Sequence, residues 1–259
     1  MKEFIISLKC EWMKTRHTAA VRLALFGALL IPMIMIIAQL SYPQKMSYNA
    51  NPEQFWIKLY IHSWEFMSVL LLPFGIILIT SMLNQIEFRN NTWKQTLITP
   101  QRLSTIYFAK FVIISFLLFL FFASFNGSII ISGILPGLFH NAIDIPNHWP
   151  PLGKIIADMG ALWLTSLPLL GLIYTISLRY ANFIVPVGVG LACIIAGIFA
   201  LQWKQGYLVP FAYSTFHFMT MSGQEKFIFP YNIYWLSVLW FIAFACIGYF
   251  SFIYRKYKA

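Results

Sequence analysis

The feature that most constrains this chain is a set of six long stretches that contain no Asp, Glu, Lys or Arg. They cover residues 23–44, 66–86, 111–143, 159–178, 180–203 and 227–254. About 20 apolar residues in a helix, each rising about 1.5 Å, cross the hydrocarbon core of a bilayer. Every stretch is long enough to do so. The pattern therefore predicts an all-α polytopic membrane protein with six transmembrane helices.

Composition excludes a soluble alternative. Hydrophobic residues make up 59% of the 259-residue chain and charged residues 10%, whereas soluble domains have roughly 45–50% and about 25%. We expect one transmembrane domain over residues 1–259 and no soluble domain. The predicted spans are about 23–40, 64–83, 108–134, 156–178, 183–202 and 232–254. A loop of about twenty residues, which carries Trp56 and Trp64, is expected between the first two spans.

The charges indicate how the spans are oriented. If both termini lie on one side, that side holds thirteen of the eighteen cations but only three of the eight acids, so the whole net charge of +10 falls there. Lys and Arg concentrate on the cytoplasmic side of membrane proteins. We therefore expect both termini to be cytoplasmic. Since the cations flank apolar spans, anionic lipid headgroups are the expected partner rather than nucleic acid.

Two segments outside the spans have their own pattern. In residues 1–22, Phe4, Leu8 and Trp12 recur every four positions, which is typical of an amphipathic helix lying in the membrane interface; the alternative is a disordered basic arm. Residues 203–231 are rich in aromatic side chains but interrupted by Gly and Pro. Non-helical backbone at membrane depth must be buried in protein, so we expect an outer re-entrant or interfacial segment there.

Sequence signatures of catalysis are missing. The chain has no GxxxxGK[ST], HExxH or GxSxG motif. Cys10, Cys193 and Cys246 have no metal-ligand spacing, and Pro146 interrupts the turn that carries His140 and Asp144. We predict no catalytic residue, no metal site and no cofactor bound by this chain. An intramembrane enzyme would need a constellation that the sequence lacks.

Polar side chains within the spans are scarce. Asn126 is the most deeply placed, and a helix–helix hydrogen bond is a better interpretation than a substrate contact. Glu65 lies at the outer end of span two, where water reaches it. Ion-coupled carriers usually keep an ionisable group inside the membrane. The chain therefore shows no energy source of its own.

The longest inner connection, residues 84–107, suggests a protein partner. Thr92 and Gln95 have the spacing of a capping box, and Pro100 favours a stop at Thr99. A helix over about 93–98 would then present Trp93 and Leu97 on one face, which suits a groove on another protein. The alternative is a short helix that contacts only lipid.

These residues resemble the type 2 ABC-transporter permease family. The resemblance lies in Glu11-Trp12-Met13-Lys14 before span one and in the run Glu87…Asn91-Thr92-Trp93-Lys94…Leu97…Thr99-Pro100-Gln101-Arg102…Lys110 after span two. Within that family the chain is most similar to lantibiotic-immunity and bacitracin-resistance permeases. The number of spans, the inside termini and the chain length agree with the family.

The resemblance implies a permease subunit in a bacterial cytoplasmic membrane, paired with a second copy or a paralogue. Two cytoplasmic ABC ATPase subunits would bind ATP-Mg and dock on the coupling loop. The implied docking residues are Glu87, Arg89, Thr92, Trp93, Leu97, Pro100 and Arg102. The exported substrate would be an amphipathic peptide antibiotic, and the candidate substrate-facing residues are Tyr207, Phe211, Phe216 and Phe218.

Other readings stay open at this point. The same permease could move haem, a metal or a lipid-linked compound, and a stand-alone channel or a membrane scaffold are further alternatives. Span five carries a stripe of small residues, Gly188, Ala192, Ala196 and Ala200. Such a stripe suits close helix packing, either with a second chain or within this one.

Overall fold

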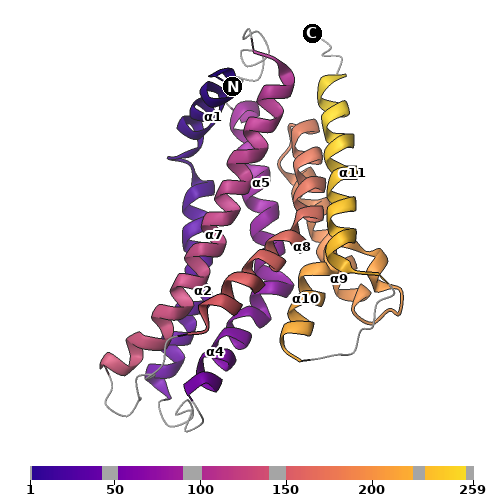
Figure 1. The fold of residues 1–259 in the computed structure, drawn as a ribbon. Helices are drawn as coiled ribbons and strands as arrows, with labels where there is room; N and C mark the ends of the chain where they lie inside the picture. The colour runs from indigo at the N-terminus through magenta and orange to yellow at the C-terminus, as the bar shows by residue number, and fades with distance from the viewer. Residues whose placement is uncertain (1, 43–51, 90–100, 140–149, 224–230, 255–259) are drawn as a thin grey trace.

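The structure is a computed structural model that describes residues 2–42, 52–89, 101–139, 150–223 and 231–254. All secondary structure in these ranges is helical (Figure 1). The helices are α1 (Lys2–Thr15), α2 (Ala19–Ser41), α4 (Pro52–Phe66), η1 (Met67–Leu71), α5 (Leu72–Arg89), α7 (Leu103–Phe139), α8 (Leu152–Arg179), α9 (Ile184–Ala200), η2 (Gly206–Leu208), η3 (Pro210–Ala212), α10 (Tyr213–Met221) and α11 (Ile233–Ile253).

Five helices in the described ranges are long and apolar enough to cross a membrane. They are Ala19–Ser41, Phe55–Arg89, Leu103–Phe139, Leu152–Arg179 and Ile233–Ile253. The apolar helix α9 has 17 residues, or about 26 Å at 1.5 Å per residue. After α9 the chain folds back through η2, η3 and α10 before α11. The expected all-helical membrane fold is therefore found, with five full-length candidate spans and one shorter apolar helix.

The ends of the bundle differ in what they hold. Helix α1, the end of α5, the start of α7 and the end of α11 lie together at the top of Figure 1, which we call the terminal end. Helix α4 and the segment from η2 to α10 lie toward the opposite, distal end. The long helices pack in pairs, α2 on α7 and α8 on α11. Ala20, Ala24 and Ala28 of α2 are fully buried, and their small side chains allow α7 to approach closely.

The region between the first two spans differs from the prediction. A loop was expected up to residue 64, but a helix begins at Pro52 and continues through η1 into α5. Trp56 and Trp64 are 3% and 0% exposed. The Trp64 ring stacks on Phe122 with centroids 5.8 Å apart and meets Phe125 edge-on at 4.9 Å. These tryptophans belong to the core and not to an exposed aromatic belt.

Helix α1 attaches to the bundle by its polar face. Its buried residues are Ser7, Glu11 and Thr15, whereas Ile5 and Met13 are more than half exposed. Phe4, Leu8 and Trp12 are only half-buried. The outward face thus carries apolar side chains beside the exposed charges of Lys2, Glu3 and Lys9, a mixture that suits a membrane interface.

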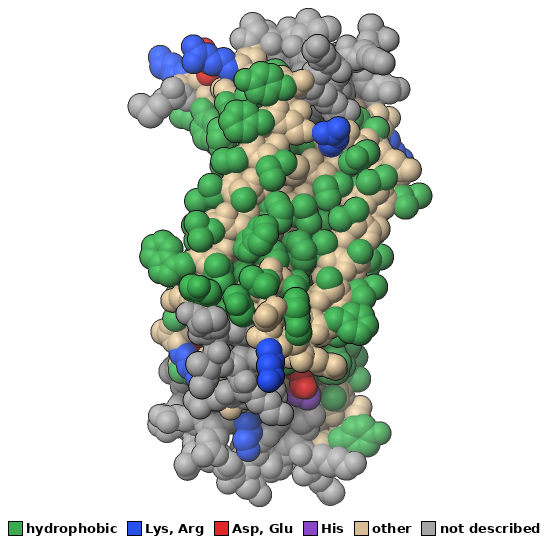
Figure 2. Space-filling view, turned by 90° about the vertical axis from the view of Figure 1, so that its right-hand side faces the viewer, with side chains coloured by type: hydrophobic (Ala, Val, Ile, Leu, Met, Phe, Trp, Pro, Cys, Tyr) green, Lys and Arg blue, Asp and Glu red, His purple; other side chains and the backbone are tan. Residues whose placement is uncertain are grey.

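The surface follows the same division. Figure 2 shows apolar side chains over the middle of the molecule, with Lys and Arg toward its two ends. Exposed large apolar residues occur on α2, α9 and α11, among them Phe26, Phe199 and Trp235. A continuous apolar band of this kind is the surface that a bilayer covers.

Candidate functional site

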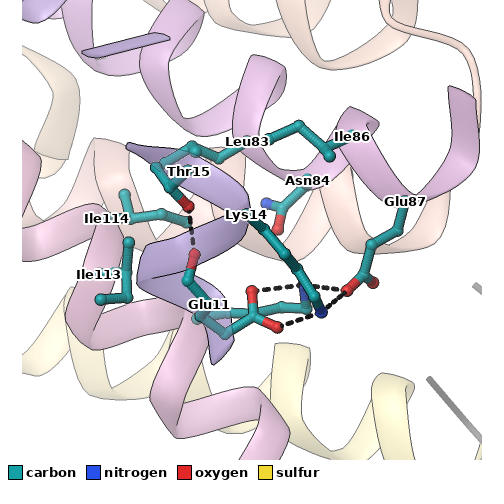
Figure 3. A pocket seen from close by; sticks show the side chains of 10 residues that line it. Glu11, Lys14, Thr15, Leu83, Asn84, Ile86, Glu87, Ile113 and Ile114 are labelled. Carbon is teal, nitrogen blue, oxygen red and sulfur yellow. Dashed lines mark hydrogen bonds and ion pairs between the residues drawn. The ribbon is translucent and has the colours of Figure 1, made fainter. Parts of the chain in front are cut away.

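Four charged side chains from three helices form a closed ring at the terminal end. Lys14 Nζ lies 2.7 Å from Glu11 Oε1 and 2.8 Å from Glu87 Oε1. Lys110 Nζ lies 3.0 Å from Glu11 Oε2 and 2.8 Å from Glu87 Oε1. Each lysine therefore bridges both glutamates; Figure 3 labels Glu11, Lys14 and Glu87 of this group. We refer to Glu11, Lys14, Glu87 and Lys110 as the charge ring.

Local structure brings the ring together. Glu11 and Lys14 are three residues apart on α1 and so share one face. Glu87 lies in the last turn of α5, and Lys110 lies near the start of α7. Glu87 and Lys110 are 1% and 4% exposed. The cavity beside them measures about 10 Å³, which is about the room that one water needs.

The ring balances its own charge. Burial alone would lower the pKa of Lys14, but the carboxylates of Glu11 and Glu87 outweigh that effect and raise it. Lys14 therefore stays protonated at neutral pH. Two cations and two anions cancel, and such buried pairs fix geometry more surely than they add stability. Each charge contacts two of opposite sign, so removing one member leaves the ring with one charge that is not balanced.

A further hydrogen bond ties α1 to the start of α7. Ser7 Oγ donates to Gln101 Oε1 over 2.7 Å. Together with the charge ring, it fastens α1 to α5 just before residues 90–100 and to the chain just after them. These contacts therefore join α1, α5 and α7 on both sides of residues 90–100.

The predicted docking residues are distributed unevenly around this point. Thr92, Trp93, Leu97 and Pro100 lie outside the described residues. Arg89 and Arg102 are exposed, whereas Glu87 is buried and holds two lysines. Its carboxylate therefore faces the ring and not the surface. The sequence alone offered only the spacing of Glu11 and Lys14 as a signal, because the other pairs join distant segments.

The two polar candidates of the spans, Asn126 and Glu65, lie in different environments. Asn126 Nδ2 donates to the carbonyl of Phe122, four residues back on its own helix, so the expected helix–helix bond is not what this amide makes. The side chain of Glu65 is 55% exposed, which agrees with a position that water reaches, and its Oε2 lies 3.2 Å from Nδ1 of His62.

The proposed substrate-facing aromatics are mostly inside the protein. Phe216 and Phe218 are 1% and 6% exposed, and Tyr207 and Phe211 are half-buried. The Phe211 ring stacks on Phe244 of α11. They do not form an open aromatic surface, because η3 and α10 pack against α8.

A second polar cluster lies within the distal half. His217 of α10 shares a hydrogen bond of 2.8 Å between its Nδ1 and the Tyr234 hydroxyl. Its Nε2 lies 3.8 Å from Asp158 Oδ1 of α8, too far for a hydrogen bond. Burial lowers the pKa of His217 to about 4, so the imidazole is neutral at pH 7. Among the described residues no group of three His, Cys, Asp or Glu could hold a metal ion.

Taken together, the long apolar helices define a multi-pass membrane protein, and the charge ring joins three of its helices at one end. Residues 7–197 match the family described as ABC-2 family transporter protein. This match covers most of the chain, so the protein belongs to that family and is a membrane permease subunit of an ABC transporter. The expected family is thereby confirmed. No curated protein and no solved structure matches this chain.

The family also bears on the partners. ABC-2 permeases are generally non-catalytic membrane subunits, and the family implies a bilayer and an ABC ATPase. The matched region begins within α1 and ends within α9. It therefore includes all four members of the charge ring, whereas α10 and α11 lie beyond it.

Proposed function

We propose that this chain is the passive gate of an exporter that a separate cytoplasmic ATPase drives through residues 84–107. The observation that carries the proposal is the charge ring, which joins α1, α5 and α7 on both sides of the connecting segment. Family membership supports the ATPase partner. Closure of two ATPase subunits would push this segment, and the ring would pass the push to three helices at once.

The proposal includes orientation and assembly. The excess of Lys and Arg supports a cytoplasmic terminal end in a bacterial cytoplasmic membrane, since cations are retained on that side. Gly188, Ala192 and Ala196 face outward from α9, and no atom lies within 4 Å of a Cβ built on Gly188. Their exposure leaves this part of the small-residue stripe available for a second copy or a paralogue, giving a dimer that binds two ATPases.

For the substrate, we propose an amphipathic peptide antibiotic of the lantibiotic or bacitracin type. The support is the resemblance of the Glu11–Lys14 and Glu87–Lys110 segments to immunity and resistance permeases. Haem, a metal or a lipid-linked compound are the alternative cargoes. A deletion strain exposed to these compounds in parallel tests the choice, and hypersensitivity to metals or haem alone would contradict the peptide assignment.

Docking is tested with the double variant Trp93→Ala/Leu97→Ala. We expect the ATPase to be lost on co-purification while the permease stays in the membrane. The matched control is Trp203→Ala/Leu208→Ala, which removes an exposed Trp and an exposed Leu from the distal end. Full ATPase recovery with the first variant would reject docking at this loop, and uphill transport by the permease alone would reject the passive gate.

A further inference from the structure

A groove of about 820 Å³ opens on the side of α5 at the terminal end. It lies between the start of α2, the last turns of α5 and the connection from α8 to α9. Its walls include Met82, Ile86 and Phe183. Large apolar side chains therefore line the groove along α5 and along the connection from α8 to α9, unlike the charge ring.

Two arginines contribute the charge of this groove. Arg22 lies in the first turn of α2 and Arg89 at the end of α5, and both are exposed. The eleven residues that line the groove include no Asp or Glu. Among the described residues, neither guanidinium has an ion pair. The nearby acids Glu11 and Glu87 are each held by two lysines.

The start of α2 adds to this positive potential. Thr18, Ala19 and Ala20 line the groove, and the Thr18 side chain makes no capping hydrogen bond to α2. Its hydroxyl donates instead to the carbonyl of Thr15. The first backbone N–H groups of a helix have no partner within the helix and favour an anion. They support the two arginines, which carry the main argument.

We propose that this groove binds one phospholipid with an anionic headgroup. The phosphate would lie between Arg22 and Arg89, where charges are complementary. The glycerol and the upper acyl chain would follow the apolar walls, and the remainder would continue into the surrounding lipid. A wholly polar anion would leave those walls exposed to water, whereas a zwitterionic lipid would bring its own cation close to the two arginines and leave the site with excess positive charge.

The site has a mechanical consequence. The groove is lined by Ile86, Phe88 and Arg89, and Glu87 of the charge ring lies among them in the same turn of α5. A bound lipid therefore holds the end of α5 from one side while the ring holds it from the other. This inference depends on membrane embedding and not on the proposed cargo or direction of transport.

Native mass spectrometry of the purified full chain, released from nanodiscs of phosphatidylcholine and phosphatidylglycerol, tests the proposal. The variant is Arg22→Gln/Arg89→Gln, and the matched control is Arg16→Gln/Arg179→Gln, which removes two exposed arginines that do not line the groove. We expect wild type and control to retain phosphatidylglycerol. Its affinity should fall about thirtyfold in the groove variant, since each surface cation contributes about 1 kcal/mol.

Three outcomes would overturn the proposal. One is equal retention of phosphatidylglycerol by wild type and groove variant. Another is that dissolved glycerol phosphate stabilises the wild type as much as phosphatidylglycerol does, which would indicate a site for a soluble anion. The third is retention of phosphatidylcholine as strong as that of phosphatidylglycerol. Thermal unfolding of the variant in pure phosphatidylcholine checks that folding is intact, and failure of ATPase docking would leave these results unchanged.

Discussion

Among single residues, Glu87 has the most demanding environment. It is 1% exposed and contacts both lysines of the charge ring. Glu87→Gln keeps the shape of the side chain but removes its charge, so the buried Lys110 is left with only Glu11. We expect a loss of about 3–5 kcal/mol of stability, as is usual when one partner of a buried pair is removed. Thermal unfolding in nanodiscs measures it.

The control for that variant is Glu3→Gln, which changes an exposed glutamate of α1 outside the charge ring. It should change the unfolding temperature by no more than measurement error, because exposed charges contribute little. Equal changes in unfolding temperature for the two substitutions would mean that the charge ring contributes no more to stability than an exposed charge does.

His217 makes stability depend on pH. Its pKa is lowered by burial to about 4, below the ordinary value near 6.5, so the unfolded chain takes up a proton first as pH falls. The stability that depends on neutral His217 is fully present above pH 6.5 and is lost as the pH falls from 6.5 to 4. The loss is at most about 3 kcal/mol, because Asp158 at 3.8 Å would favour the imidazolium.

The measurement is the unfolding temperature from pH 7 to pH 4.5, compared between wild type and His217→Gln. The wild type should lose more over this range than the variant, which has no imidazole to protonate. If the unfolding temperatures of wild type and variant fell in parallel with pH, the pKa of His217 would not be lowered by burial.

At the scale of elements, helix α7 offers a matched pair of glycines. A Cβ on Gly133 would lie 2.5 Å from the Trp56 ring, whereas a Cβ on Gly127 would meet nothing within 4 Å. Gly133→Ala should therefore push α4 away from α7 and lower stability by about 1–3 kcal/mol. Gly127→Ala should be neutral or slightly stabilising because Ala favours helix.

The comparison is made by proteolysis and thermal unfolding under identical conditions. Since both changes add one methyl group to the same helix, a difference between them reports the contact with α4. Similar behaviour of the two variants would contradict the close packing of Trp56 on α7.

The elements were also where the sequence was most and least informative. Charge-free stretches locate α2, α7, α8 and α11 because lipid requires long apolar helices. Helix α4 was not predicted, because its charged and aromatic residues are typical of a loop. Only the structure shows that Trp64 packs on Phe122. The buried positions of Phe216 and Phe218 follow from the fold-back of η3 and α10 on α8, which no local pattern encodes.

The candidate site was only partly predictable. The resemblance drew attention to both segments that hold the ring, but not to their contact. The pairing of Glu11 with Lys110 joins positions 99 residues apart, and helical spacing indicates only the contact of Glu11 with Lys14. Long-range pairing depends on how α1 lies across α5 and α7, and this is a property of the assembled bundle.

For the whole molecule, we expect a variant of the charge ring to keep its binding to the ATPase but to lose transport driven by that ATPase. Lys14→Gln/Lys110→Met removes both cations, so α1 is no longer fastened to α5. We expect the ATPase to co-purify normally, while substrate-stimulated ATP hydrolysis and export fall at least tenfold. Assays of the reconstituted complex measure both.

The control is Lys9→Gln/Lys154→Met, which neutralises two exposed lysines outside the ring. Export should be unaffected. If the ring variant folds normally and also exports normally, movement of the ATPase must reach the membrane helices without the contacts of α1.

The π-helical turn at Met67–Leu71 sets how the two halves of the second membrane helix can behave. A π-helical turn holds about one residue more than an α-helical turn, so the side chains of α4 are rotated about the helix axis relative to those of α5. At this turn, the Thr215 hydroxyl lies 3.5 Å from the carbonyl oxygen of Ser68. Absorbing that surplus residue into regular α-helix would swing Trp64 by about 100°. The Trp64–Phe122 stack would then open, so the π-helical turn is what allows Trp64 and the residues of α5 to be buried at the same time.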